Sequence, residues 1–405
     1  MGAKAAAAVT GPTPRRVWKY VTQRLALAAF FRAPGDGRQR PRIPARALVW
    51  SLVLGHLLRE DTFAGVEALV RSRARRALQV GRAFGNDALA YFTARLDPAE
   101  ARQNLAVVLR GAKRRKAFAA APWIGVAVDG TTTTCCRRRR CRYCRPLRTP
   151  HGTVGGYRHH VVLVSVVGTP VPLPCDVELY GPGDSEYAAA QRVLTRAIAG
   201  LGPRFADYVV ADGEFATAPF LHAVGALGLR VVVRLKENVP SVYAAARQRY
   251  AGTPPTGRFT ERGDQVEVWD AADFAPWPGL RWATVRVLLY RQTKPDGRVI
   301  EALWLTDWPL AAVPSPALYR MAKSRWAVEN EGFNVAKTHH GMEHLCHHHA
   351  NSIVVNWLLL LLALTIERLY RLRYLHRGAH HVRTAIQFVR DLRISLGVPA
   401  FANSG

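Results

Sequence analysis

The sequence predicts an α/β fold that follows a helical N-terminal region and contains a β-rich insertion. Residues 14–118 are rich in Ala, Leu and Arg, and apolar residues recur at helical spacing between Ala45 and Leu57. From Trp123 to Leu235, short apolar strands alternate with helical segments. Between Gly257 and Trp308, alternating apolar and polar residues are typical of antiparallel strands.

Basic residues strongly outnumber acidic ones. The 405 residues include 57 Lys and Arg against 29 Asp and Glu, which gives a formal net charge of +28. This excess favours a polyanionic partner, and nucleic acid in particular, over a merely solvated cationic surface. Basic clusters at 71–76 and 113–116 in the helical region fit contacts to DNA phosphates, although a solvated helix face explains them equally well.

The sequence contains no segment that indicates export or a membrane span. The first residues, Met1-Gly2-Ala3-Lys4, lead into basic residues without the apolar stretch of a secretory signal. The strongest apolar run, Ile353 to Ile366, contains Asn356 and is shorter than the roughly 20 residues that cross a bilayer. We therefore expect a cytoplasmic protein with a buried apolar helix and no membrane partner.

Two aspartates follow apolar strands and precede glycines, Asp129 in VAVDGT and Asp212 in VVADGE. A single Asp before Gly is most often an ordinary turn residue. In open α/β sheets, however, the carboxyl ends of neighbouring strands carry ligands and catalytic groups. Two such aspartates on strands that are expected to be neighbours therefore predict a functional site.

A third acidic residue, Glu329, lies in the helical segment Arg325-Trp326-Ala327-Val328-Glu329. Arg325 and Glu329 are four residues apart, so they share a helix face, and the arginine can orient the carboxylate or hold a phosphate. This arrangement, with two strand-end aspartates and a Glu in an R-W-x-[IV]-E helix after a β-rich insertion, resembles the DDE transposases of bacterial insertion sequences. The resemblance covers residues 45 to 375.

The resemblance implies cut-and-paste DNA transposition on an RNase H-like core in the bacterial cytoplasm, associated with the nucleoid. The acidic triad Asp129, Asp212 and Glu329 would bind two Mg²⁺ or Mn²⁺ ions, which prefer carboxylate oxygens and can serve both the attacking and the leaving oxygen. Double-stranded DNA, as transposon ends and target, and a homodimer in the DNA complex are the implied partners. The candidate DNA contacts are Arg325, Lys337, Arg234 and Lys236.

The helix departs from the family's Y-R-E-K signature, which is Tyr, two residues, Arg, three residues, Glu, six residues, Lys. Ala322 stands at the Tyr position, and Ala336 stands at the Lys position with Lys337 one residue late. On an ideal helix Lys337 lies about 80° around the axis from Glu329, so it needs a local bulge or a long reach to serve. Glu331 is the alternative third carboxylate, but it points roughly 200° away from Glu329, and we expect it to be solvated or paired.

A cysteine-rich and arginine-rich loop (135–148) follows the first aspartate and contains Cys135, Cys136, Cys141 and Cys144. A similar Cys-x-x-Cys insertion occurs at this place in one branch of these transposases. Zn²⁺ could be held by Cys136, Cys141 and Cys144, completed by His151, His159 or His160. Because no second Cys-x-x-Cys lies in range, free thiols on a basic, DNA-facing loop are an equal alternative.

The His-rich stretch from His339 to His349 contains further potential ligands. It follows the predicted catalytic helix directly, and the same branch carries a comparable H-x-E-H segment there. Phosphate contact or structural hydrogen bonding therefore explains it better than a dedicated metal site. We expect the remaining acidic candidates, Glu214 and Asp184, to lie on the surface or to support the triad.

Five regions follow from these patterns: a helical DNA-binding region (1–118), the first part of the core (119–245), a β-rich insertion (246–312), the C-terminal core helices (313–375) and a basic tail (376–405). Two other functions fit the same residues. One is a nuclease or resolvase of the same fold that cuts without joining, and the other is a catalytically inactive DNA-binding relic.

Overall fold

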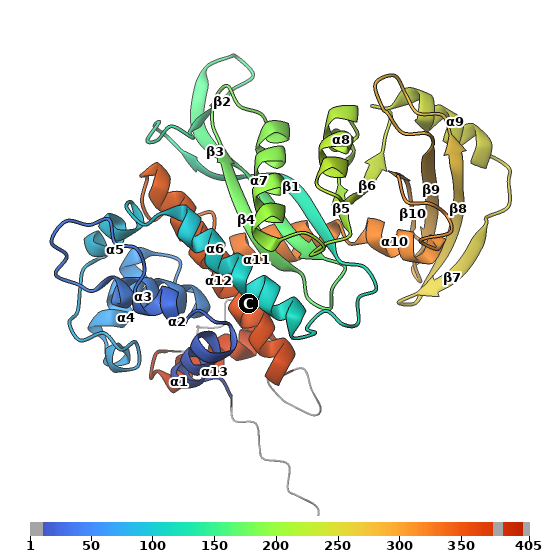
Figure 1. Cartoon of the computed structure of the whole chain (residues 1–405). Helices are drawn as coiled ribbons and strands as arrows, with labels where there is room; N and C mark the ends of the chain where they lie inside the picture. The colour runs from blue at the N-terminus through green and yellow to red at the C-terminus, as the bar shows by residue number, and fades with distance from the viewer. Residues whose placement is uncertain (1–10, 376–383, 400–405) are drawn as a thin grey trace, which may run out of the picture.

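One mixed β-sheet of ten strands runs through the described part of the chain (Figure 1). The structure is a computed structural model that describes residues 11–375 and 384–399. The strand order is β2-β3-β1-β5-β6-β10-β9-β8-β7, with β4 on the same edge of β3 as β2. The strands are β1 (Gly125–Cys136), β2 (Arg145–Arg148), β3 (Val154–Val167), β4 (Leu173–Tyr180), β5 (Tyr208–Ala211), β6 (Arg230–Leu235), β7 (Gly257–Glu261), β8 (Asp264–Phe274), β9 (Val285–Thr293) and β10 (Val299–Thr306).

The first half of the sheet has the topology of an RNase H-like core, as the sequence predicted. Antiparallel strands β4, β3 and β1 are followed by β5 and β6, which run parallel to β1. The helix α7 (Glu186–Leu201) connects β4 to β5, and α8 (Ala218–Ala226) connects β5 to β6 (Figure 1). Strand β5 is buried along its whole length, as expected for a central parallel strand that is covered on both faces.

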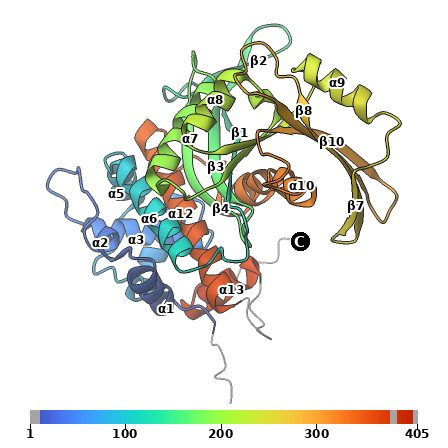
Figure 2. The same cartoon turned by 45° about the vertical axis from the view of Figure 1, so that its right-hand side comes forward.

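The β-rich insertion continues this sheet rather than forming a separate one. Strand β10 pairs antiparallel with β6, and β9, β8 and β7 extend the sheet outward. The helix α9 (Pro240–Tyr250) leads into the insertion, and α10 (Ser315–Lys323) leaves it. Helix α10 packs against β6, β8 and β9, inside the curve of the extended sheet (Figure 2). The insertion therefore positions the start of the segment that carries Glu329.

The N-terminal region consists of helices that pack around one long buried helix, α12 (Ala350–Tyr374). Helix α12 is long and apolar enough to cross a membrane, but its most apolar window is completely buried inside the fold. His56 and Asn356 join α3 to α12 through a buried hydrogen bond of 3.2 Å. The helices before the sheet are α1 (Pro14–Lys19), α2 (Ala28–Arg32), α3 (Ala45–Leu57), α4 (Phe63–Arg71), α5 (Asn86–Thr93) and α6 (Pro98–Arg114), with short π and 3₁₀ turns η1 (Tyr20–Arg24) and η2 (Arg73–Arg76).

The basic tail contains one more helix, α13 (Ala385–Ser395), which begins at a capping box formed by Thr384 and Gln387. Phe388 of α13 is buried against Tyr370 of α12, with ring centroids 5.6 Å apart. Arg393 donates to a carboxylate oxygen of Glu60 at 2.8 Å. This helix is therefore part of the helical region, whereas the tail residues 376–383 and 400–405 lie outside the described residues.

A buried ion pair fixes the end of the insertion. Arg286 of β9 donates twice to Asp270 of β8, at 2.8 and 2.5 Å, and both side chains are almost completely buried. Arg286 also donates to the backbone carbonyls of Trp308 and Pro309, which lead into α10. The pair thus joins two strands of the insertion to the segment that approaches the site.

We predict that Asp270→Ala lowers the free energy of unfolding by about 3–5 kcal/mol, because the guanidinium of Arg286 stays buried without its counter-ion. Urea denaturation measures this change. The matched control is Asp296→Ala, which removes an exposed partner of Arg298 in the same insertion and should change stability by less than about 1 kcal/mol. Equal effects of the two substitutions would contradict the assigned role of the buried pair.

Candidate active site

Asp129 lies inside strand β1, so its expected place just past the strand end was wrong. The strand continues to Cys136 because β3 pairs with it beyond the aspartate, with Asp129 opposite Leu163 and Thr133 opposite His159. Threonines after Gly130 also favour extended backbone. The Asp129 side chain is 19% exposed, and it accepts a hydrogen bond from the Gly130 N–H at 3.0 Å.

Asp212 follows β5 directly, as expected. In the parallel pair of β1 and β5, Ala127 lies opposite Val210, and Asp129 and Asp212 each come two residues further along their own segments. Lys236, just after β6, donates to Asp212 Oδ2 at 2.6 Å. Burial raises the pKa of Asp212, but the hydrogen bonds from Lys236 and Gly213 and the nearby positive charges outweigh it, so the pKa lies below its usual value.

Arg325 joins the first aspartate to the helical glutamate. Its Nη1 lies 3.3 Å from Asp129 Oδ2, and its Nη2 lies 3.6 Å from Glu329 Oε2. The guanidinium is only 9% exposed, whereas the Glu329 side chain is 49% exposed. A single arginine therefore holds two carboxylates from segments that are distant in the sequence, and its charge also acts on Asp212.

The segment that carries Glu329 is not a regular α-helix like the one assumed in the sequence analysis. Helix α10 ends at Lys323, and a π-helix, η4 (Val328–Phe333), then leads into α11 (Asn334–His340). A π turn contains one residue more than an α turn, which is the local bulge that Lys337 requires. Lys337 donates to Thr131 Oγ1 and to the Thr132 carbonyl of β1, both at 2.8 Å. The amine thus lies two to three residues from Asp129 along β1.

Comparisons with known proteins assign a family to this arrangement. The Transposase DDE domain family matches residues 124–366. The chain belongs to the DDE transposases. It is also similar to a solved structure, the piggyBac transposase synaptic complex with hairpin DNA determined by cryo-EM, with a TM-score of 0.46 and 9% identity over 95% of this chain and 80% of that chain. No curated protein sequence matches the chain.

DDE transposases are nucleotidyl-transfer enzymes that typically use divalent metal ions, and in this transposase the electrostatics of Asp129 fit a cation site. Burial raises the pKa of Asp129 to about 6. Arg325 and the Gly130 N–H oppose the rise, while the nearby carboxylates Glu186 and Glu329 add to it. The buried Asp129 carboxylate therefore carries its negative charge at a cost that a bound cation would reduce.

Glu186 is a fourth acidic residue of this cluster that the sequence did not single out. It is the first residue of α7, after the cap residue Ser185, and reads in the sequence as an ordinary helix start. A Cβ atom on Gly130 would lie 2.2–2.4 Å from its carboxyl group, so the glycine makes room for this carboxylate beside Asp129. Burial, together with Glu214 and Asp212, raises the pKa of Glu186 despite its hydrogen bond from Tyr180.

Arg234 and Glu331 are the remaining candidates from the sequence, and neither contacts the carboxylates of the site in the described part of the chain. Arg234 of β6 lies opposite Trp304, and its charge acts on the buried Tyr290, whose pKa is raised to about 12 by burial. The Glu331 side chain is exposed, while its backbone carbonyl accepts a hydrogen bond from Arg368. The structure thus directs Glu329, rather than Glu331, toward Arg325 and Asp129.

Two of the candidate zinc ligands lie together with a histidine. Cys141, Cys144 and His159 offer ligand atoms that all lie within 4.8 Å of one another. Of the three histidines that the sequence left open, it is therefore His159 on β3 that faces the thiols. Cys136, at the end of β1, is not a member of this group, and the side chain of Cys135 is outside the described part.

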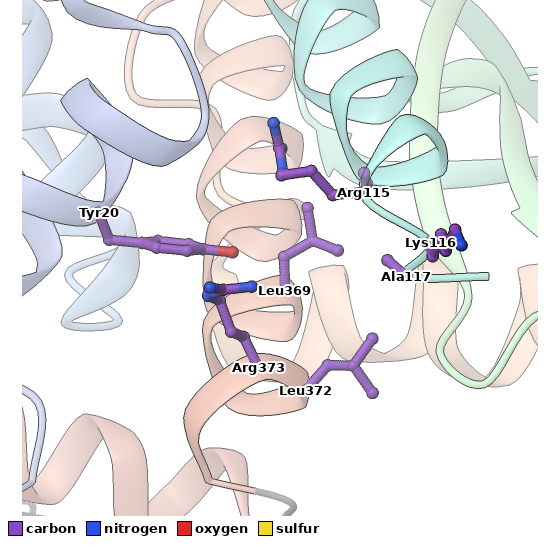
Figure 3. A pocket seen from close by; sticks show the side chains of 8 residues that line it. Tyr20, Arg115, Lys116, Ala117, Leu369, Leu372 and Arg373 are labelled. Atoms are coloured by element: carbon purple, nitrogen blue, oxygen red, sulfur yellow. The ribbon is translucent and has the colours of Figure 1, made fainter. Parts of the chain in front are cut away.

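A separate basic cavity of about 280 Å³ lies between the end of α6 and α12 (Figure 3). Arg115, Lys116 and Arg373 contribute positive charge to its lining, and the Tyr20 hydroxyl points into it. Not all of the neighbouring basic cluster is available to a ligand, because Lys113 donates to the backbone carbonyls of Arg204 and Phe205. Part of this cluster therefore holds the fold together rather than facing solvent.

We predict that Asp129→Asn stabilises the metal-free protein at neutral pH. The folded-state pKa of about 6 lies above the unfolded value near 3.8, so the stability linked to this group is complete below pH 3.8 and is lost as the pH rises through 6. This difference corresponds to about 3 kcal/mol at most. Urea denaturation in EDTA should show the variant more stable at pH 7.5, with the advantage below about 1 kcal/mol at pH 4.

The control is Glu331→Gln, which removes an exposed carboxylate from the same region and should give no pH-dependent difference. A gain in stability for Asp129→Asn that is the same at pH 4 and pH 7.5, or no gain at either pH, would contradict the raised pKa of Asp129.

Proposed function

We propose that this transposase cuts DNA at transposon ends and joins the freed 3′-hydroxyl to target DNA, with Asp129, Asp212 and Glu329 as the ligands of two Mg²⁺ or Mn²⁺ ions. The proposal rests on the guanidinium of Arg325, which forms ion pairs with Asp129 and Glu329 and whose charge also acts on Asp212. Such a convergence of carboxylates costs electrostatic energy and is expected at a functional site.

The residues fit a pair of hard divalent cations. Each ligand is a carboxylate, and Glu329 remains half-exposed, so its oxygens are open to an ion. Glu186 accepts a hydrogen bond from Tyr180 and, in the described part of the chain, none from an arginine or lysine. It therefore adds negative charge to the cluster. When bound, two such ions activate an attacking oxygen and stabilise the leaving oxygen of a phosphodiester.

The basic residues have distinct roles in this proposal. Arg325 fixes the relative positions of Asp129 and Glu329, since it donates a hydrogen bond to Asp129 and forms an ion pair with Glu329. Lys236 keeps Asp212 ionised and therefore ready to bind a cation. Lys337 donates to Thr131 and to the Thr132 carbonyl of β1, and in this proposal its charge would also hold a DNA phosphate. Arg234 would contact the same DNA from β6.

We infer that the partners are double-stranded DNA, as transposon ends and target, and a second copy of the chain, because two ends must be cut together. The net charge of +28 supports a DNA partner, and the helical N-terminal region (1–118) would supply part of the contact surface. The protein would act in the bacterial cytoplasm, at the nucleoid.

We predict that Asp129→Asn, Asp212→Asn and Glu329→Gln each lower Mg²⁺-dependent end cleavage by at least about 100-fold, whereas Glu331→Gln stays close to wild type. The assay uses labelled linear DNA that carries the sequences flanking the gene. Pre-cleaved labelled ends should become covalently attached to plasmid DNA. Cleavage without attachment would identify a nuclease or resolvase instead, and DNA binding without metal-dependent cleavage would identify an inactive relic.

A further inference from the structure

We propose that Cys141, Cys144, His159 and His348 form a zinc site that fastens the arginine-rich loop after β1 to β3 and to the connector between α11 and α12. The Sγ atoms of Cys141 and Cys144 lie 3.7 Å apart, and His159 Nε2 lies 3.0 and 3.6 Å from them. A tetrahedral zinc with Zn–S bonds of about 2.3 Å places two sulfurs about 3.8 Å apart, and sulfur and nitrogen about 3.6 Å apart. Two of the three spacings thus match, and the third requires a shift of about half an ångström.

Three different elements bring these ligands together. Cys141 and Cys144 lie in the loop between β1 and β2, and their Cys-x-x-Cys spacing folds the chain back, with the Cys144 N–H donating to the Cys141 carbonyl. His159 comes from β3, opposite Thr133, and its ring is completely buried. Its Nε2 atom faces both thiols, which places this nitrogen to bind a metal together with the two sulfurs.

The fourth ligand comes from the His-rich connector. His348 is close enough for its charge to act on both His159 and Arg140 of the loop. Its Nδ1 atom is buried and has no hydrogen-bond partner in the described part of the chain, as is also true of His347 Nδ1, but His348 rather than His347 is among the charges that act on His159. The nitrogens of His348 lie outside the group of three, so the ring must move inward when a metal binds. An unpaired buried nitrogen costs stability that a metal bond would recover.

The proposed zinc site lies between two segments that carry basic residues, the arginine-rich loop after β1 and the connector after α11. The loop carries the exposed residues Arg138, Arg139 and Arg140 and begins at the end of the strand that contains Asp129. The connector begins one residue after α11, which carries Lys337. A metal that joins the loop to the connector would therefore fix the position of the loop arginines relative to Lys337 and to strand β1. This replaces the expectation that the His-rich stretch serves only phosphate contacts or structural hydrogen bonds.

The test measures metal directly and does not depend on transposition. The full chain, purified in zinc-containing buffer and dialysed, should contain one zinc per chain by inductively coupled plasma mass spectrometry. Replacement by Co²⁺ should give thiolate-to-cobalt absorption in the near ultraviolet and the visible bands of a tetrahedral S₂N₂ site. Substoichiometric zinc, a cobalt spectrum without thiolate bands, or a Cys141–Cys144 disulfide in the freshly purified chain would overturn the proposal.

Matched variants test each ligand. Cys144→Ser and His159→Gln should lower zinc affinity by at least about 100-fold, and His348→Gln should lower it by at least about 10-fold. The controls are Cys136→Ser, His160→Gln and His347→Gln, which should keep the wild-type affinity. If His348→Gln leaves the affinity and the cobalt spectrum unchanged, the assignment of the fourth ligand is wrong. If a ligand variant fails to fold, the cobalt spectrum of the wild-type chain still decides whether thiolates bind the metal.

Discussion

The contact of one guanidinium with two carboxylates is the interaction on which the account of this protein depends. Arg325 lies between Asp129 and Glu329, 196 residues away from the first of them in the sequence. Burial of the Asp129 carboxylate costs stability, as its raised pKa reflects, and the neighbouring carboxylates Glu186 and Glu329 add to that cost. The fold holds them in place although an empty cluster of this kind destabilises it, as is common where stability is lost in favour of function.

The rest of the structure maintains this convergence from three directions. The parallel pairing of β1 and β5 brings together the two segments that carry the aspartates. The insertion extends the same sheet and supports α10, so the Glu-bearing segment approaches the aspartates from the insertion side. The buried helix α12 follows that segment and ties it to the helical region, in part through the bond between Arg368 and the Glu331 carbonyl.

The sequence predicted strands correctly where complete burial produces a continuous apolar run of residues. The alternation of strands and helices predicted between Trp123 and Leu235 is confirmed by β5 and β6, because central parallel strands are buried on both faces and are therefore apolar along their length. The extension of β1 beyond Asp129 was not predicted, since polar threonines there read as a loop until β3 pairs with them. The sequence also did not predict that the insertion continues the core sheet, because the local pattern of apolar residues does not say which strands pair.

The candidate site was readable only in part for the same reason. Arg325 and Glu329 are four residues apart, so their shared helix face could be predicted from the sequence. The position of Lys337 could not, because the π turn adds one residue to the helical repeat. Glu186 resembles an ordinary first-turn acid, and only the close packing above Gly130 places it among the other carboxylates. The choice among three histidines near the Cys-x-x-Cys loop likewise needed the β-strand alternation that separates His159 from His160.

The central claim is that three carboxylates from separate segments share a pair of metal ions, and anomalous scattering from a Mn²⁺-bound complex with end DNA tests it most directly. We expect two anomalous peaks about 4 Å apart, each with oxygen ligands from Asp129, Asp212 or Glu329 at about 2.2 Å. Manganese bound elsewhere, in a complex that still cleaves its DNA, would contradict it.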